Sequence, residues 1–220
     1  MALHLHISDL VSMPRCFRLL VCAFLLFIST TLVVQAASDS VARNSTTNTT
    51  LLNASKKFIR NQCNSTATYP NVCYNSLSPY ASKIKSNRLI LTRVSVLLAL
   101  KAARASSRVM TRLSKLNTLT HDETLVVADC GENIDDTVDL LEQSADGILH
   151  LNGTRTNEDR FQWDDIKTWM SAAITDDYTC TDEFHEMEVR PSVQKMIKTS
   201  VDYAEWMTSN ALAFVNRLAY

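Results

Sequence analysis

The chain has 220 residues with 22 basic and 23 acidic side chains, and its formal net charge of −1 gives no bulk attraction for nucleic acid. Only three glycines and four prolines leave few turn signals, which argues against an all-β fold. The length suits one domain behind a processed leader.

Residues 1–36 have the pattern of a signal peptide. An apolar run follows Arg15 and Arg18 and ends in small residues around Ala36, where we expect cleavage. A membrane anchor is the alternative, because residues 19–37 are nearly long enough to span a bilayer. A Ser-Thr-Thr segment interrupts this run and no charged stop follows it. We therefore expect a secreted protein with no membrane segment after cleavage.

The next segment, 37–54, is rich in Ser, Thr and Asn and is predicted to be a flexible, glycosylated tether. We expect the folded domain to occupy residues 55–220. Five Asn-X-Ser/Thr sequons agree with export, and their candidate asparagines are Asn44, Asn48, Asn53, Asn64 and Asn152.

A helical hairpin is expected first in the domain. Phe58 and Ile59 supply apolar positions for a short helix beginning near residue 55, and residues 72–77 suit a second short helix. Residues 68–71, Thr-Tyr-Pro-Asn, form a turn signal between them.

Two long helices of opposite charge follow. Residues 87–117 contain no acid, and five basic residues at steps of three and four mark one face of the predicted helix 87–116: Lys101, Arg104, Arg108, Arg112 and Lys115. Thr120 and Glu123 form a capping box that begins the second helix, which is predicted to reach about residue 149. No Lys or Arg occurs from 117 to 154, so the two helices should pack antiparallel and attract along their flanks.

Two more helices complete the predicted fold. The third carries apolar residues from Phe161 to Ile174 and is expected to break at 175–177, Thr-Asp-Asp. Pro191 suits the first turn of the last helix. Its apolar stripe is Val193, Ile197, Val201, Ala204, Met207, Ala211, Phe214 and Leu218. We therefore predict an all-α, antiparallel four-helix bundle with an N-terminal helical hairpin.

The cysteines predict two disulfides. Cleavage of the leader removes Cys16 and Cys22 from the six cysteines and leaves four, which permit three pairings. A local Cys63–Cys73 bridge and a long-range Cys130–Cys180 bridge fit the helical layout best. By the chain-entropy estimate they contribute about 3 and 4 kcal/mol.

The second long helix has an apolar stripe on one side and acids on the other. The stripe includes Cys130, whereas Glu132, Asp136 and Asp139 fall together on the opposite side. A bridge to Cys180 would hold the two Cα atoms roughly 5.5–6 Å apart. This bridge would bring Thr179 and Asp182 close to Asp129, Glu132 and Asp136. Such a strip is either a solvated face or a binding surface.

Other classes of function have weaker support. His121, His150 and His185 have no metal-ligand spacing, and no Gly-X-Ser-X-Gly nucleophile motif occurs. We therefore expect no catalysis, cofactor or metal. The basic face could contact an anionic surface, although salt screens it and the acidic helix neighbours it. A lipid carrier is a third class, which lipid in the purified protein would favour. The tryptophans are expected in the core and at its boundary.

Five stretches carry a family resemblance. They are the Cys63–Cys73 loop with Thr68-Tyr69-Pro70 inside it, residues 129–140, residues 169–175, residues 179–184 and residues 209–213. Together they resemble the plant invertase/pectin methylesterase inhibitor family. The resemblance covers nearly all of the predicted mature chain.

The resemblance implies a secreted four-helix bundle with both disulfides paired as above. It also implies a one-to-one complex that blocks the substrate cleft of a cell-wall carbohydrate enzyme. In the pectin methylesterase branch, the matching contact residues would be Glu132, Asp136, Asp139, Thr179 and Asp182. Gly131 and Ile134 depart from the family pattern; Ile134 lies on the buried side, so we expect altered packing rather than lost binding.

The target enzyme follows from the branch of the family. The Pro-Lys-Phe stretch associated with invertase inhibition is missing, and residues 169–175 with Thr179-Cys180 are more similar to the pectin methylesterase branch. Pectin methylesterase is therefore the expected partner, with acid invertase as the alternative. A homodimer through the apolar hairpin remains open.

Overall fold

The computed structural model describes residues 48–151, 156–182, 184 and 187–218. Residues 52–220 form one compact unit, and of the other unit, 1–51, only the helical residues 48–51 are described. The described residues contain helices and no strand. This confirms the predicted all-α class.

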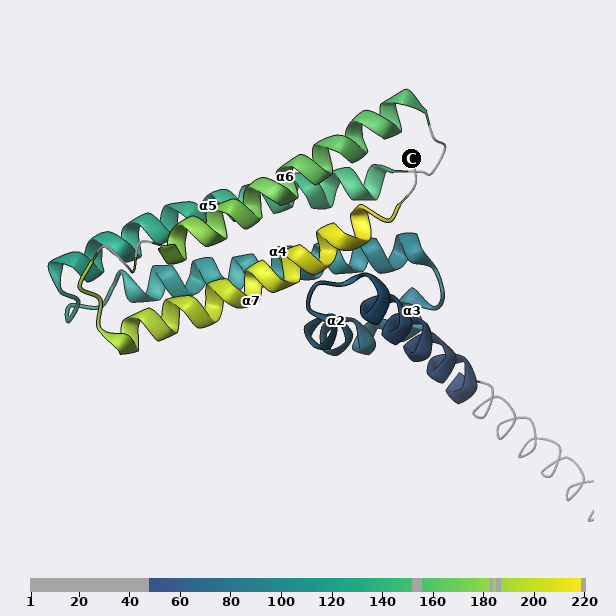
Figure 1. Cartoon of the computed structure of the whole chain (residues 1–220), viewed down its shortest axis with the longest axis horizontal. Coiled ribbons are helices and arrows are strands. Elements are labelled where there is room, and N and C mark those ends of the chain that lie inside the picture. Colours follow the sequence, from purple (N-terminus) through teal and green to yellow (C-terminus); the bar gives the residue numbers. More distant parts are fainter. Residues whose placement is uncertain (1–47, 152–155, 183, 185–186, 219–220) are drawn as a thin grey trace, which may run out of the picture. The chain divides into compact units, whose positions relative to one another are not determined.

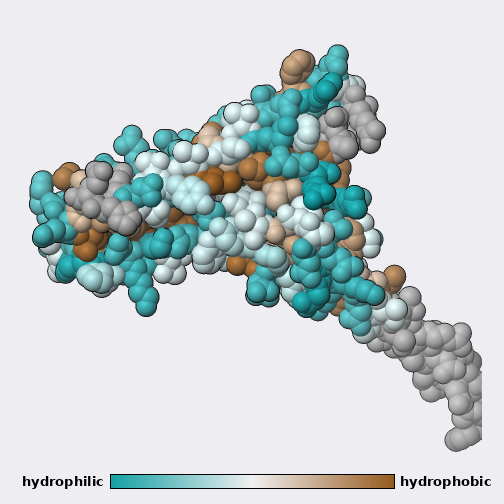
Figure 2. All heavy atoms as spheres, viewed as in Figure 1, coloured by the Kyte–Doolittle hydropathy of each residue, from teal (hydrophilic) through white to brown (hydrophobic). Residues whose placement is uncertain are grey.

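Four long helices form an antiparallel bundle (Figure 1). Each packs against two others: α5 against α4 and α6, and α7 against α6 and α4. On the face seen in Figure 2, hydrophilic residues cover most of the outer helix surfaces and apolar residues gather in the seam between helices. The four helices are α4 (Arg88–Leu113), α5 (His121–His150), α6 (Asn157–Asp182) and α7 (Pro191–Val215).

The first helix of the predicted hairpin begins earlier than the sequence suggested. Residues 48–54 are helical and continue into the helix that reaches residue 66, so the tether predicted over 37–54 is wrong for these residues. No Gly or Pro interrupts 48–66, and Leu, Ala and Lys favour helix there. The sequon residues Asn48, Asn53 and Asn64 are exposed on this helix. Asn44, Asn152 and the boundary at residue 36 lie outside the described residues.

The predicted hairpin is closed by the Cys63–Cys73 disulfide, whose Cα atoms are 5.7 Å apart. Three short elements follow the first helix: α2 (Pro70–Leu77), which carries Cys73, the 3₁₀ turn η1 (Ser78–Tyr80) and α3 (Ala81–Ile84). Their apolar residues form a small core of their own that also reaches α4 and α7. Its fully or nearly fully buried members include Ile59, Leu77, Ile84, Leu91 and Phe214.

The hairpin loop is held on α7 by Tyr69 and Asn210. The Tyr69 amide donates to Asn210 Oδ1 at 2.8 Å, and Asn210 Nδ2 donates to the Tyr69 carbonyl at 3.1 Å. The Tyr69 ring lies 5.5 Å from the Trp206 ring. This pairing satisfies two backbone groups of a loop that has no ladder of its own. It also places two of the recognised stretches, 68–70 and 209–213, in contact.

The predicted helix starts are present. Thr120 and Glu123 form both bonds of the capping box at the start of α5, and Pro191 occupies the first turn of α7. The seven stripe residues from Val193 to Phe214 are buried, whereas Leu218 is only partly buried. The tryptophans lie at the core boundary, where Trp163 Nε1 donates to the Val215 carbonyl at 2.9 Å.

The break predicted at 175–177 is wrong, because α6 continues through these residues to Asp182. Asp177 falls on the buried stripe between Ala173 and Cys180 and is 1% exposed. Its Oδ1 accepts a hydrogen bond from the Thr137 hydroxyl of α5 at 3.4 Å. Burial raises the pKa of Asp177 well above its ordinary value, and the nearby charge of Glu205 adds to the effect. A carboxyl that is protonated can occupy an apolar stripe that a carboxylate would interrupt.

Candidate functional site

Helix α5 presents three carboxylates to solvent from a firmly packed position. Cys130, Ile134 and Leu141 are 0% exposed on its inner side. Glu132, Asp136 and Asp139 are exposed on its outer side, as the helical period requires. Val138, predicted on the buried stripe, is only partly buried. The core side fixes the rotation of the helix, and this rotation keeps the acidic strip outward.

The last turn of α6 is tied to this helix by a disulfide. Cys130 and Cys180 form the bridge, with their Cα atoms 4.5 Å apart. Thr179 and Asp182, one and two residues away along α6, are both exposed. The Thr179 hydroxyl donates to the Thr175 carbonyl at 3.0 Å, so its oxygen remains free to accept a hydrogen bond.

Asp176 is a further acid of this surface that the sequence reasoning missed. It is partly buried on α6, and its pKa is raised, first by partial burial and then by the charge of Asp136 on α5. That effect shows that the two carboxyls are neighbours across the α5–α6 contact. The signal was the four-residue step from Asp176 to Cys180, which places both residues on adjoining faces of one helix. The predicted break at 175–177 concealed it.

The flank of α5 that faces α4 carries other acids, and these have partners. Glu142 forms an ion pair with Arg104 at 2.7 Å, and Asp135 accepts a hydrogen bond from the Ser107 hydroxyl at 2.7 Å. The basic face of α4 therefore compensates this flank. Among the described residues, Glu132, Asp136 and Asp139 take part in no ion pair.

We define the α5–α6 acidic surface as these exposed or partly exposed residues: Glu132, Asp136, Asp139, Asp176, Thr179 and Asp182. It combines a hydroxyl acceptor with carboxylates that form no ion pair within the described part of the chain, on two helices joined by a disulfide. Burying such carboxylates is costly unless an opposing surface supplies cations or donors. The surface is therefore suited to a positively charged or donor-rich partner.

The metal-ligating side chains of the described residues are scattered. Within them, no group of three His, Cys, Asp or Glu side chains is placed to hold a metal ion. His121 and His150 stand at opposite ends of the 30-residue helix α5, about 45 Å apart, and His185 lies outside the described part of the chain. None of the described helices is both long and apolar enough to cross a bilayer.

The sequence profile of the plant invertase/pectin methylesterase inhibitor family matches residues 57–214. The chain belongs to this family. The match runs from the helix before the Cys63–Cys73 loop to the end of α7, so it covers both disulfides and the whole bundle. The family described by this profile is one of inhibitors and is not catalytic.

Several characterised relatives are similar along most of the domain. Pectinesterase inhibitor 10 of Arabidopsis thaliana is 38% identical over 74% of this chain, although the match covers 51% of that protein. The 21 kDa protein of Daucus carota is 31% identical over 88% of this chain and 94% of its own length. Pectinesterase inhibitor 9 of Arabidopsis thaliana is 32% identical, with 89% and 93% covered. Thus the chain spans about half the length of the first relative and nearly all of the other two.

Proposed function

We propose that this protein inhibits pectin methylesterase by forming a one-to-one complex in which the α5–α6 acidic surface covers the substrate cleft. The observation that carries the proposal is the exposed strip Glu132, Asp136 and Asp139, joined through the Cys130–Cys180 bridge to Thr179 and Asp182. In the cell wall such a complex would limit the de-esterification of pectin. The names of the relatives support this choice of target.

The chemistry of the substrate supports the same surface. Pectin methylesterase acts on a galacturonan chain that becomes polyanionic as methyl esters are removed, so its cleft must accommodate carboxylates. A cleft of that kind needs cations or hydrogen-bond donors. A helical surface that presents carboxylates and a hydroxyl acceptor can pair with those groups. The disulfide fixes the two helices before binding, which lowers the entropy lost when the complex forms.

The proposal is tested by assaying two enzymes side by side. The oxidised protein from residue 37 to residue 220 is titrated into purified pectin methylesterase with methylated pectin, and into acid invertase with sucrose. We expect inhibition of pectin methylesterase that saturates at one equivalent. A reduced and alkylated sample is the control. Inhibition of acid invertase alone, or of neither enzyme, would overturn the proposal.

Secretion is part of the same proposal. We propose that the leader is removed after Ala36 and that the mature protein reaches the cell wall, where its two disulfides are stable. Mass spectrometry of the protein recovered from the wall fluid of a plant tissue should give an N-terminus at Ala37 and glycans on one or more of Asn48, Asn53 and Asn64. An intact residue 1–36 segment would contradict it. Light scattering of this material also tests for a homodimer.

A further inference from the structure

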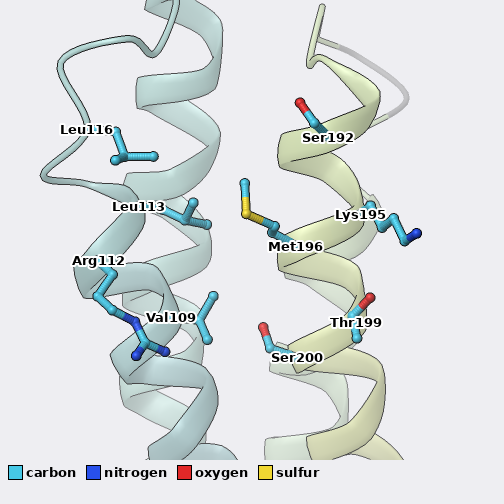
Figure 3. A pocket seen from close by; sticks show the side chains of 9 residues that line it. All are labelled: Val109, Arg112, Leu113, Leu116, Ser192, Lys195, Met196, Thr199 and Ser200. Atoms are coloured by element: carbon cyan, nitrogen blue, oxygen red, sulfur yellow. The ribbon is translucent and has the colours of Figure 1, made fainter.

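A groove between the C-terminal part of α4 and the N-terminal part of α7 lies apart from the α5–α6 acidic surface. Its volume is about 760 Å³. Figure 3 shows Met196 extending from α7 toward α4, where Leu113 and Leu116 face the groove. Leu116 is 45% exposed and Met196 is 44% exposed, so each side of the groove presents a large apolar side chain to solvent.

The spacing of the lining residues fits a helix. Val109 and Leu113 lie four residues apart on α4, Leu116 follows in the turn after its end, and the lining residues of α7 recur at steps of three and four. The apolar residues of the last turn of α4 and of the turn that follows it therefore face two turns of α7, over about 10 Å. Side chains of a third helix can enter such a groove at i, i+4 and i+7. The unbranched Met196 side chain adapts to what it contacts.

The charges beside the groove have one sign. Arg112 lines its α4 side and Lys195 its α7 side, and no acidic residue is among the lining residues. Arg108 and Lys115 are exposed nearby on the basic face of α4 and its following turn. In the described part of the chain, none of these four cations forms an ion pair. In Figure 3 Lys195 points outward, and its four-carbon stem is long enough to turn over a bound segment.

We infer that this groove is a second docking site, which binds an amphipathic helical segment with acidic flanks from a partner protein. Apolar side chains on one face of that helix would fill the space between Leu116 and Met196, and acids on its flanks would pair with Arg112 and Lys195. Charge complementarity decides the kind of partner, because the apolar floor alone would accept a helix of either charge. The site goes beyond enzyme inhibition, since it shares no residue with the α5–α6 acidic surface.

Two covalently bridged helical peptides of about four turns test the inference, because such short helices are marginal without a bridge. Both carry leucines at i, i+4 and i+7; one has glutamates and the other lysines on the flanks. We expect the acidic peptide to bind at least about 10-fold more tightly than the basic one, with affinity falling as salt rises. Equal affinity for both peptides, or no binding, would overturn the inference.

Variants locate the site. Met196→Glu should weaken binding of the acidic peptide about 10-fold or more, whereas Leu97→Glu, at an exposed leucine elsewhere on α4, should leave it unchanged. Inhibition of pectin methylesterase and the melting temperature should be retained in both variants. Three results would overturn the inference: peptide binding that survives Met196→Glu, a Met196-dependent dimer by light scattering, or Met196-dependent binding to anionic lipid vesicles in place of the peptide.

Discussion

Arg190 forms an ion pair with the buried carboxylate of Glu123, and this pair connects the start of α5 to the start of α7. Its Nε and Nη2 donate to the two oxygens of Glu123, each at 2.6 Å, and its backbone amide donates at 3.0 Å. Glu123 also accepts from the Thr120 amide in the capping box. One carboxylate therefore closes a helix start and connects two helices. Hydrogen bonds from Arg190 lower the pKa of Glu123 from 4.5 to about 2.

Glu123→Gln should lower the melting temperature by roughly 5 to 10 °C at pH 7, because the amide cannot accept the paired guanidinium bonds. A lowered pKa contributes stability above about pH 4.5 that is lost as the pH falls toward 2. The variant should therefore lose less stability than the wild type over that interval. Thermal melts from pH 2 to 7 measure this, with the exposed Glu132→Gln as the control. Equal melting temperatures at pH 7 would contradict the role of the pair.

Asp177 should make the protein less stable as the pH rises. Its Oδ2 is buried without a hydrogen-bond partner among the described residues; burial raises its pKa above 3.8, and the charges of Glu205 and Asp176 raise it further. A raised pKa means that the folded state holds the proton more tightly, so the stabilisation is complete below about pH 3.8 and declines through the folded-state pKa. Asp177→Asn should remove this decline and keep the bond from Thr137.

The variant should thus exceed the wild type in melting temperature at pH 7 by a few degrees, on the order of 2–4 °C for each kcal/mol regained. The difference should shrink toward pH 4. Asp165→Asn, at an exposed position of α6, is the matched control and should follow the wild type at both pH values. A variant that melts lower than the wild type at pH 7 would show that an ionised Asp177 is stabilised in the core.

The two disulfides should differ in what they stabilise. Replacing Cys130 and Cys180 by Ala should lower the free energy of unfolding by about 4 kcal/mol, and replacing Cys63 and Cys73 by about 3 kcal/mol, since the closed loops differ in length. Urea unfolding measures both values. Only the first replacement releases the end of α6 from α5, so it should also weaken inhibition under conditions where the protein is folded. Full inhibition by that variant would show that the bridge does not shape the inhibitory surface.

The complex should tighten as the pH falls. Contact with an enzyme removes further water from Asp176, whose pKa is already raised by partial burial and by the charge of Asp136, and this favours its protonated form. The complex then takes up protons, so its dissociation constant should decrease from pH 7 to pH 5. Affinity titrated over this interval, with the enzyme and inhibitor each checked for folding, measures the trend. Constant or weaker affinity toward pH 5 would contradict proton uptake.

The parts of the fold that could be predicted are those recorded locally in the sequence. The stripes of α5 and α7 are long and periodic, and the capping box at Thr120 and the first-turn Pro191 mark helix starts directly. By contrast, the Ser, Thr and Asn content of residues 37–54 predicts a tether, whereas residues 48–54 are helical. The absence of Gly and Pro from that stretch is the local feature that agrees with a helix.

The rest depends on contacts between distant residues. Asp177 interrupts an apolar stripe in sequence, and only the packing of the bundle shows that burial and the nearby Glu205 raise its pKa. The Glu123–Arg190 pair joins residues 67 positions apart, and no local pattern signals it. In the candidate site, the acidic strip of α5 follows from helical period, whereas the proximity of Asp176 to Asp136 required the packing of α6 on α5.

The central claim is that the α5–α6 acidic surface is the inhibitory surface, and the inhibition constant against pectin methylesterase tests it most directly. Asp136→Ala and Thr179→Ala remove exposed contacts, so each should raise the inhibition constant by about 10-fold or more with little change in melting temperature. Glu142→Ala, on the flank of α5 paired with Arg104, should leave the constant unchanged. If Asp136→Ala and Thr179→Ala inhibit as well as the wild type, the inhibitory surface lies elsewhere on the protein.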